Sequence, residues 1–419
     1  MGVTAGRRVR RIAIDTRPLA VPAFRRLWVT TAITAVGSQL TTVAVPKQVF
    51  DITGSSGFVG LTGAFGLVPL LIFGLWGGAI ADAVDRRTVI LVSNVAVAAT
   101  SVLFWLQAVA GIDNVWLILS LLAVQQAFVA INIPTRTAAV ARIVPLGLLP
   151  SATALTATVS SFGMVFGPLL AGAVMPLVGL PVLYLVDSVA LVVATLMMIK
   201  FPSIKPLGDV KRGAGLKDIV AGFRYLAAKN VLLASFLLDI IAMVAGMPRA
   251  LFPEMAERTF GDPPGGGLAL GWLYAAIPIG ALLCGLASGW IGNIRRHGVG
   301  VTVAICAWGA AVIGFGLANS LWLAVMFLVI AGAADMVSMV YRSAILQTDA
   351  TDEMRGRMQG VFTVVVAGGP RVADLVHGWT AAGVGTASAA TGGGVLVIVL
   401  AVVAVGCLPA FWRYVAPTR

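Results

Sequence analysis

Long apolar runs separated by short polar segments fill almost the whole chain. Each run extends over roughly 20 residues, the length that a helix needs to cross about 30 Å of hydrocarbon. The runs are continuous and do not alternate with a period of two, and backbone groups in lipid must be hydrogen-bonded internally, so we predict helices rather than barrel strands. The pattern predicts twelve membrane-spanning helices, at residues 26–49, 56–81, 88–110, 114–134, 152–177, 180–199, 231–255, 267–291, 299–318, 321–345, 358–382 and 393–412.

The composition supports a membrane protein. Hydrophobic residues make up 59% of the 419 residues and charged residues 11%. A soluble domain needs a far more polar surface than this composition provides. The chain is therefore expected to be an all-α membrane protein that crosses the bilayer many times.

The net charge of +12 raises the question of nucleic-acid binding, but the placement of the charges argues against it. With the N-terminus in the cytoplasm, most Lys and Arg fall in the segments on the inner side, including residues 1–25 and 200–229. This asymmetry follows the positive-inside rule and predicts that both termini are cytoplasmic. We expect no nucleic-acid partner. The basic segment 1–25 runs directly into a full-length span, so no cleavable signal peptide is expected.

The widest polar interval, residues 200–230, divides the chain into two halves of six predicted helices. Apolar residues recur within it at helical spacing, which predicts a short amphipathic helix on the inner leaflet. The predicted organisation is a basic N-terminal segment, a first six-helix bundle, a linker, a second six-helix bundle and a cytoplasmic tail, at residues 1–25, 26–199, 200–230, 231–412 and 413–419.

The two halves contain related sequences. The stretch TRTAAVARIVP follows the fourth predicted helix and YRSAILQTDAT follows the tenth, and each leads into a span with a Gly-Pro pair, in GPLLAG and GPRVAD. Two halves in the same orientation indicate a parallel duplication. Such a duplication is typical of secondary transporters of the major facilitator type.

A small charged segment, GGAIADAVDRRTVIL, interrupts the apolar sequence at residues 77–91. Gly78, Asp82, Arg86 and Arg87 resemble the signature loop of the major facilitator superfamily, a Gly, an Asp four residues later and then a basic pair. The resemblance implies a charge cluster that latches the two halves on the cytoplasmic side. Two residues depart from the pattern, which usually has Arg and Gly where this chain has Ala83 and Asp85. A solvated loop whose basic pair only sets topology is the alternative.

The fifth predicted helix carries Gly163, Gly167, Pro168 and Gly172, which resemble the antiporter motif of the same superfamily. Small residues four apart let helices approach closely, and the proline frees a carbonyl and bends the helix. The resemblance implies export rather than import. Plain close packing of helices would explain the same residues.

Most of the chain resembles the enterobactin-exporter branch of the superfamily. The likeness lies in VAVPKQVFDITGSS, GGAIADAVDRRTVIL, LKDIVAGFRYLAAKNVLL, LGWLYAAIPIGALLCGLASG and MRGRMQGV. The same branch includes macrolide and multidrug efflux proteins, which also carry an acidic residue in the sixth helix, as Asp187 does here. The resemblance implies proton-driven export across the bacterial inner membrane and does not fix the substrate.

Three carboxylates within the predicted spans are candidates for proton coupling. Asp239 and Asp335 fall near the midplane, and Asp187 lies in the outer part of the sixth helix. Ionisable groups in the membrane are costly and mark functional sites by default. Because burial disfavours the charged form, such a carboxylate can take up and release a proton near neutral pH. The alternatives are a carboxylate capped by hydroxyls or paired permanently with an arginine.

Further polar residues are candidates for substrate contact or gating. Arg371 and Asp374 are three residues apart on one helical face, so they either contact substrate or neutralise each other. The first half has Leu169 and Gly172 at the corresponding positions, so packing alone does not require the pair. Lys47 is expected to extend to the outer surface, with an exit-side contact to an anionic substrate as the alternative. Uncharged groups in the helices that line the cavity of this fold are Gln39, Gln125, Gln126 and Asn132.

The sequence as a whole predicts a proton-coupled exporter of an amphiphilic small molecule such as a siderophore, which works by rocking two bundles about a midplane cavity. A broad-specificity multidrug pump and a non-transporting receptor or scaffold are the alternatives. No ATP-binding loop is present, and we expect no enzymatic activity, no cofactor and no metal site. The expected partners are the substrate, protons and the lipid bilayer, and the expected state is a monomer.

Overall fold

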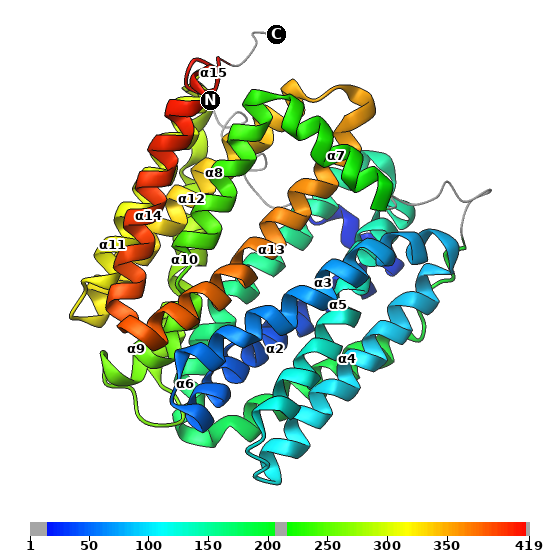
Figure 1. The fold of residues 1–419 in the computed structure, drawn as a ribbon. Coiled ribbons are helices and arrows are strands. Elements are labelled where there is room, and N and C mark those ends of the chain that lie inside the picture. The colour runs from blue at the N-terminus through cyan, green and yellow to red at the C-terminus, as the bar shows by residue number, and fades with distance from the viewer. Residues whose placement is uncertain (1–14, 206–215, 416–419) are drawn as a thin grey trace, which may run out of the picture.

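The computed structural model describes residues 15–205 and 216–415, without the side chains of residues 75–83, 216–220, 293, 352, 353, 355–357, 359 and 363. All regular secondary structure in this part of the chain is helical (Figure 1). The all-α fold predicted from the apolar runs is confirmed.

The first half follows a short 3₁₀ turn, η1 (Arg17–Ala20). Its helices are α2 (Pro22–Thr53), α3 (Ser56–Ala83), α4 (Arg86–Val109), α5 (Val115–Ile143) and α6 (Leu149–Met198), with η2 (Leu146–Leu148) before α6. α6 is broken at Gly179, whose φ of 77° lies in the left-handed region that favours glycine. The break lies between the two spans predicted at 152–177 and 180–199, so α6 contains two crossings.

The second half consists of α8 (Asn230–Gly246), η3 (Arg249–Leu251), α9 (Phe252–Arg258), α10 (Leu268–Leu286), η4 (Ser288–Asn293), α11 (His297–Gly316), α12 (Leu321–Asp349), α13 (Asp352–Val384), α14 (Thr386–Cys407) and α15 (Pro409–Trp412). The linker between the halves contains α7 (Leu216–Ala228), at the position predicted for an amphipathic helix. In the described part of α7, Leu226 is buried and Phe223 is exposed.

Two helix boundaries differ from the prediction for identifiable reasons. The span predicted at 231–255 ends at Gly246, because Met247 precedes Pro248 and is extended, a conformation that interrupts a helix. The span predicted at 393–412 begins at Thr386, so Gly392, which the prediction placed before the span, lies within α14. A side chain at Gly394 would lie 2.5 Å from the Gly309 oxygen, so this glycine permits close packing of α14 against α11.

Nine helical segments of the described chain are long and apolar enough to cross a membrane. One of them, Leu146–Met198, contains the break at Gly179 and therefore two crossings. α2, of 32 residues, and α13, of 33 residues, are long enough to cross but carry more polar side chains. Together these segments account for the twelve crossings predicted.

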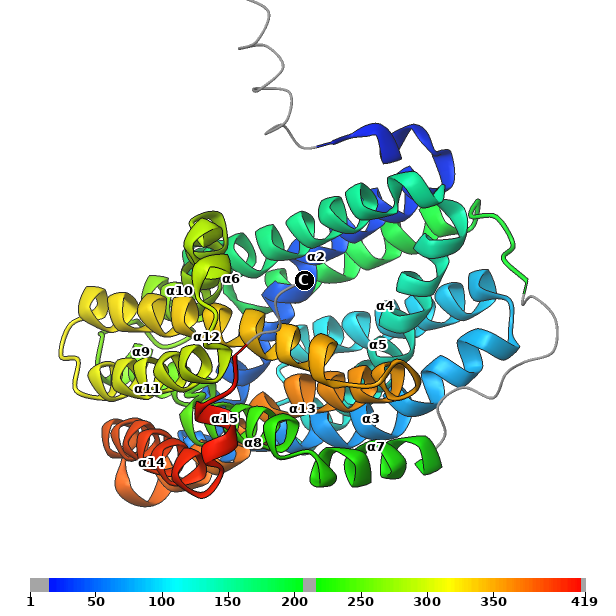
Figure 2. The ribbon, with the colours of Figure 1, turned by 90° about the horizontal axis from the view of Figure 1, so that it is seen from above.

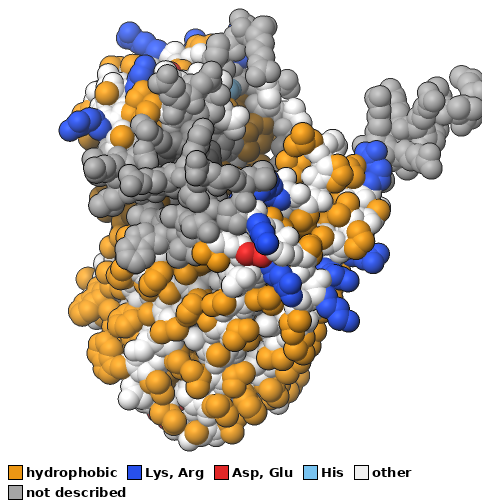
Figure 3. Space-filling view, turned by 90° about the vertical axis from the view of Figure 1, so that its right-hand side faces the viewer, with side chains coloured by type: hydrophobic (Ala, Val, Ile, Leu, Met, Phe, Trp, Pro, Cys, Tyr) orange, Lys and Arg blue, Asp and Glu red, His pale blue; other side chains and the backbone are white. Residues whose placement is uncertain are grey.

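The end of the molecule where α7 lies is called the inner end here, and the opposite end the outer end (Figure 1). Seen along this direction, α2–α6 and α10–α14 form two groups, and α3 lies beside α13 (Figure 2). The main contacts between the halves are α3 with α13 and α6 with α10. On the face in Figure 3, hydrophobic side chains cover most of the described surface, and Lys and Arg gather toward the inner end.

The buried apolar core joins the halves near the outer end. One cluster combines Val49 and Met175 of the first half with Phe252 and Leu270 of the second. A second cluster lies within the second half and includes Trp308 and Tyr341. The shared cluster closes the molecule at the outer end.

Candidate transport site

A cavity of about 480 Å³ lies between the halves. Residues of both halves line it, and its volume lies within the range of ordinary small-molecule sites. Its polar side chains from the first half are Ser38, Gln39, Thr41, Thr42, Thr62, Gln125, Gln126 and Asp187, and those from the second half are Arg249, Tyr274, Arg371 and Asp374. The structure therefore brings six of the predicted candidates to one cavity: Gln39, Gln125, Gln126, Asp187, Arg371 and Asp374.

Asp187 of α6 is a buried carboxylate held by hydroxyl groups. Its side chain is 1% exposed, and one oxygen accepts hydrogen bonds from Thr41 Oγ1 at 2.6 Å and Ser101 Oγ at 3.0 Å. Gln125 donates to the same Ser101 hydroxyl at 3.0 Å. Within the described chain, Asp187 has no Lys or Arg nitrogen within 4.0 Å, and its second oxygen, Oδ1, has no hydrogen-bond partner.

Gly37 of α2 makes the space for this second oxygen. A side chain at Gly37 would place its Cβ 2.9 Å from Asp187 Oδ1. The carboxylate thus has one oxygen stabilised by two hydroxyl donors and one oxygen that accepts no bond. Such a group gains a favourable partner when it binds a proton or meets a donor on a ligand.

Asp239 and Asp335, the two midplane candidates, lie beside an arginine in the second half. Arg342 of α12 forms an ion pair with Asp239 of α8, and its Nη2 lies 3.7 Å from Asp335 Oδ1. Arg342 also donates from Nε to Ser338 Oγ at 3.1 Å. Neither carboxylate is among the residues that line the cavity. The geometry is that of a carboxylate paired with an arginine.

The internal duplication extends to this buried arginine. Thr31 and Asp239 are each the tenth residue of their helices, α2 and α8. In the first half Arg136 donates to Thr31 Oγ1 at 3.0 Å, which corresponds to the pair of Arg342 with Asp239. The first half has a hydroxyl where the second half has a carboxylate, so an arginine contacts the same helical position in both halves.

Arg371 and Asp374 have different partners, although they share a helical face. Asp374 pairs with Arg249 of η3 at 3.3 Å. Arg371 donates to Gln126 Oε1 of the first half at 2.6 Å and to the Ala367 oxygen of its own helix at 3.2 Å. The alternative in which the two simply neutralise each other is therefore not the arrangement found. Arg249 was not singled out from the sequence, where it lies within the span predicted at 231–255. Pro248, which interrupts that span, was the available signal that the residue after it has a different setting.

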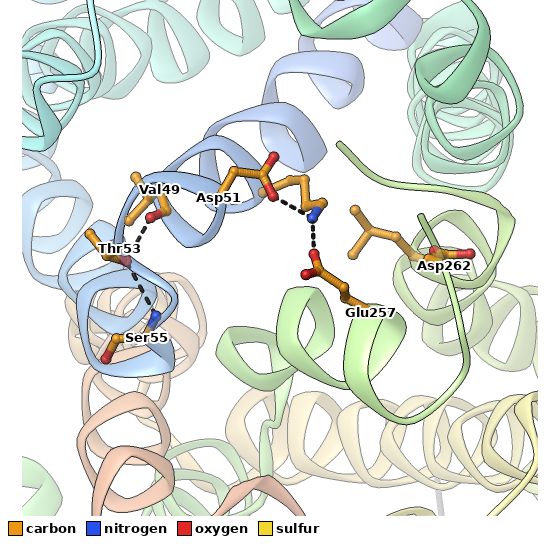
Figure 4. A network of polar contacts seen from close by, with 8 residues as sticks. Val49, Asp51, Thr53, Ser55, Glu257 and Asp262 are labelled. Atoms are coloured by element: carbon orange, nitrogen blue, oxygen red, sulfur yellow. Dashed lines mark hydrogen bonds and ion pairs between the residues drawn. The ribbon is translucent and has the colours of Figure 1, made fainter. Parts of the chain in front are cut away.

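A polar cluster at the outer end of the cavity also joins the halves. The Lys47 ammonium pairs with Asp51 of its own helix and with Glu257 of α9, the latter at 2.6 Å. Figure 4 shows Asp51 and Glu257 facing this shared nitrogen, with Asp262 nearby. Asp262 accepts bonds from the backbone N–H groups of Ala269 and Leu270 and so caps α10. We call Lys47, Asp51 and Glu257 the outer gate cluster.

The expectation that Lys47 extends to the outer surface is wrong. Its side chain is 1% exposed, because Glu257 from the other half covers the ammonium that the sequence pattern placed near the helix end. Two further contacts cross between the halves here. Ser56 donates to Glu254 at 2.5 Å, and Arg258 donates to the Gly54 oxygen at 3.0 Å.

Gly78 and Asp82, from the predicted cytoplasmic latch, lie in the part of α3 whose side chains are outside the described residues. The described part of the loop contacts the end of α6 and the segment after it. Arg87 donates to the Ile199 oxygen at 2.6 Å, and the Arg86 N–H donates to the Ile204 oxygen at 3.2 Å.

Asp85 caps α4, accepting from the Arg87 N–H at 2.9 Å, and also binds Ser203 and the Ile204 N–H. Burial opposes the ionisation of Asp85. The bonds from Ser203, Ile204 and Arg87 outweigh it and hold the pKa of the carboxyl below its ordinary value. The aspartate that replaces the usual glycine of the signature loop thus fastens α4 to the segment after α6.

The antiporter-like residues lie where helices approach closely. A side chain at Gly163 would lie 2.7 Å from the Ala35 oxygen of α2, and one at Gly167 would lie 2.4 Å from Gln39 Cβ. Gly172 approaches α10, with a hypothetical Cβ 2.8 Å from Gly271 Cα. A Cβ at Gly271 would in turn lie 2.7 Å from the Pro168 oxygen.

The same close approach occurs between α3 and α13. A Cβ at Gly60 would lie 2.6 Å from the Asp374 oxygen, and one at Gly63 only 2.2 Å from the Arg371 oxygen. We call these two crossings, α3 with α13 and α6 with α10, the glycine seams. They join the halves through backbone contacts around the cavity.

Two related bundles that share a polar cavity define a secondary transporter of the major facilitator class. A family model described as transmembrane secretion effector matches residues 14–412, and the chain belongs to this family of the major facilitator superfamily. The members of this family are transporters and not enzymes. In the described residues, no group of three or more His, Cys, Asp or Glu is placed to hold a metal ion.

Curated relatives include the enterobactin exporter EntS of Shigella boydii serotype 4 and that of Escherichia coli O1:K1. Each is 29% identical over 383 residues, which cover 90% of this chain and 90% of the relative. The fold is similar to that of a bacterial homologue of the human lysosomal transporter Spinster, at 17% identity and a TM-score of 0.68. The match covers 95% of this chain and 97% of that one. The fold is also similar to that of the nucleoside transporter NupG, at 12% identity and a TM-score of 0.75. The match covers 94% of this chain and 99% of that one.

Proposed function

We propose that this transporter is a proton-coupled exporter of an amphiphilic small molecule of the siderophore type. The observation that carries the proposal is the cavity shared by both halves, with apolar walls and a few convergent polar groups. The similarity to the enterobactin exporters supports export and a siderophore as cargo. The protein would act as a monomer in the bacterial inner membrane with both termini cytoplasmic, in keeping with the basic residues gathered at the inner end.

Asp187 is the carboxylate that we assign to proton coupling, ahead of Asp239 and Asp335. It lines the cavity, whereas the other two lie away from it beside Arg342. Proton antiport by direct competition requires that proton and cargo use the same acceptor. A protonated Asp187 can donate from Oδ1 but offers cargo no anionic acceptor, whereas the ionised form accepts hydrogen bonds from hydroxyl or amide groups of the cargo.

Transport would follow from rocking of the halves about the cavity. Parting at the outer end breaks the contact of Lys47 with Glu257, while the pair of Lys47 with Asp51 stays intact because both residues are on α2. The latch at Asp82, on the family pattern, would close the inner end in turn.

The test is transport of enterobactin into proteoliposomes whose interior is made acidic. Wild-type protein should accumulate enterobactin when the gradient is imposed, and a protonophore should abolish the accumulation. Asp187→Asn should lose gradient-driven accumulation but retain exchange down a concentration gradient. Undiminished accumulation by Asp187→Asn would refute this assignment.

Broad-specificity drug efflux remains the second candidate, favoured by the apolar walls of the cavity at Val45, Leu122, Ile133 and Met164. The same vesicles, given an external macrolide in place of enterobactin, distinguish the two. Transport of the macrolide without transport of enterobactin would support efflux of drugs.

A further inference from the structure

The second-half wall of the cavity carries more positive than negative charge. It presents two guanidiniums, Arg249 and Arg371, and one carboxylate, Asp374. Asp374 pairs with Arg249 at 3.3 Å. Within the described chain, no carboxylate lies within 4.0 Å of Arg371, whose acceptors are two neutral oxygens. Arg371 is thus a cation at the cavity wall that no carboxylate contacts directly.

The side chain of Arg371 also crosses from one half to the other. It starts on α13, passes α3 at Gly66, where a Cβ would lie 2.8 Å from Arg371 Nε, and reaches Gln126 on α5. The other hydrogen bonds and ion pairs between the halves, as far as the chain is described, involve Gly54, Ser56 and the outer gate cluster at the outer helix ends. The Arg371–Gln126 contact is therefore the polar link between the halves that a molecule in the cavity can reach.

We propose that Arg371 receives an acidic group of the exported molecule, a carboxylate or an ionised phenol, and that this group displaces Gln126. Loading the cavity would then break the polar link between the halves and favour their separation at the outer end. The proposal rests on the export function for the identity of its cargo, but it concerns binding and conformation rather than transport.

The competition favours the acidic group because of its charge. A guanidinium can bind a carboxylate with two parallel hydrogen bonds, and the attraction between two opposite full charges adds to them. Gln126 offers one neutral amide oxygen at 2.6 Å. A ligand shifts a conformational equilibrium only if it binds one state more tightly. An acid that binds Arg371 after Gln126 withdraws meets this condition, because the joined state keeps the guanidinium occupied.

The same arrangement discriminates against cations. A cationic group would be repelled by Arg371 and would find Asp374 already paired with Arg249, so the carboxylate left to it is Asp187 on the first-half wall. A cationic amphiphile can enter the apolar part of the cavity, but it has no means of displacing Gln126. The predicted cargo is therefore an amphiphile with at least one acidic oxygen group.

Two probes that differ in one functional group test the binding step. Pyrenebutyrate carries a carboxylate, and pyrenebutyramide has the same ring and chain with a neutral amide. Their affinities for purified protein can be measured by fluorescence polarisation. Wild-type protein should bind the carboxylate roughly tenfold more tightly than the amide, and Arg371→Gln should remove this preference.

Gln126 supplies two variants with opposite expectations. Gln126→Leu removes the acceptor, so the carboxylate should bind several-fold more tightly than to wild type. Gln126→Glu places a carboxylate beside Arg371, so the preference for the acidic probe should disappear. The two substitutions at one position control for each other, and a monodisperse elution profile shows that each variant is folded.

Spin labels at Asp113→Cys and Ser320→Cys, in exposed outer loops of the two halves, report the conformational step. The background carries alanine in place of Cys284, Cys306 and Cys407, which are free thiols. Double electron–electron resonance should show longer distances after pyrenebutyrate but not after pyrenebutyramide or tetraphenylphosphonium. Gln126→Leu should show part of this lengthening without any probe, and Gln126→Glu should keep the short distances with all three.

Three results would each overturn the proposal. They are equal affinity for the two pyrene probes, no binding of either probe, and an unchanged distance between the labels at residues 113 and 320 after pyrenebutyrate. Loss of enterobactin transport with these responses intact would refute the export function alone. Normal proton-driven transport by both Arg371→Gln and Gln126→Glu would refute the role of Arg371 and leave the export function standing.

Discussion

The Lys47 ammonium of α2 lies 2.6 Å from the Glu257 carboxylate of α9, and this ion pair joins the two halves of the transporter at the outer end. Lys47 is 1% exposed, and a buried charge without a partner is costly. If Glu257 were its sole partner, separation of the halves would leave the Lys47 ammonium unpaired. Asp51, one helical turn away on the same helix, also pairs with it. The buried cation therefore keeps a counter-ion when the halves separate.

This relationship predicts that Glu257→Gln opens the outer end without unfolding the protein. Removing one charge-assisted contact of about 1.5–3 kcal/mol should shift the outer-open population by roughly tenfold or more. The measurement is the distance distribution between labels at residues 113 and 320. Asp51→Asn is the matched control, because it removes one of the two carboxylates from Lys47 and leaves the contact of Lys47 with Glu257 in place. Equal lengthening in both variants would contradict the role of Glu257.

The pair of Arg342 with Asp239 predicts a structural role for this aspartate. Asp239→Asn should lower stability by about 3–5 kcal/mol, because it leaves the Arg342 guanidinium buried without its principal counter-ion. The yield of folded protein and its thermal unfolding in detergent measure the effect.

The double variant Asp239→Thr with Arg342→Gln removes both charges and should recover most of the folded protein. Transport by the recovered double variant distinguishes structure from coupling. Retained proton-driven transport would confirm that Asp239 is structural. Normal folding with lost proton-driven transport would instead assign proton coupling to Asp239.

The cap at Asp85 predicts a pH-dependent contribution to stability. The folded pKa of Asp85 is lower than its ordinary value, so the stabilisation is fully present above the unfolded value of about 4 and is lost as pH falls through the folded value. Asp85→Ala should lower stability by about 1 kcal/mol at neutral pH and progressively less at acid pH. Thermal unfolding of both proteins between pH 7 and pH 3 measures the difference. A difference that does not change with pH would contradict this account.

The seam between α3 and α13 predicts unequal effects of two glycine substitutions on one helix. Gly63→Ala would place a Cβ 2.2 Å from the Arg371 oxygen, so the helices must move apart and the outer distances should lengthen. Gly74→Ala meets nothing within 4 Å and should leave the distances unchanged, with a gain of about 1 kcal/mol from helix propensity. Identical distance distributions in the two variants would show that the seam accommodates a side chain without the helices moving apart.

The crossings could be predicted from the sequence because hydrocarbon imposes a simple rule on each segment by itself. An apolar run long enough to cross must be a helix, whatever its neighbours. The boundaries that differed depend on single residues, such as Met247 before Pro248, or on packing, as with the glycines of α14.

The site was less predictable because its charges are paired between distant helices. Depth in the membrane marked Asp239 as costly, but its partner Arg342 lies on another helix, and no local pattern links them. Lys47 was expected at the surface because its spacing places it near the helix end, whereas burial depends on Glu257 from the other half. Arg249 was missed for the same reason, since its partner Asp374 lies on α13.

The glycine seams also bear on how the transporter responds to temperature. Glycine faces consist of peptide groups and few methylenes, so parting them exposes less apolar surface than parting leucine faces of equal length. The heat-capacity change between two states grows with the apolar area exposed. The glycine seams should therefore contribute little to the difference in heat capacity between the outer-open and outer-closed states, and the shared apolar cluster at the outer end should supply most of it.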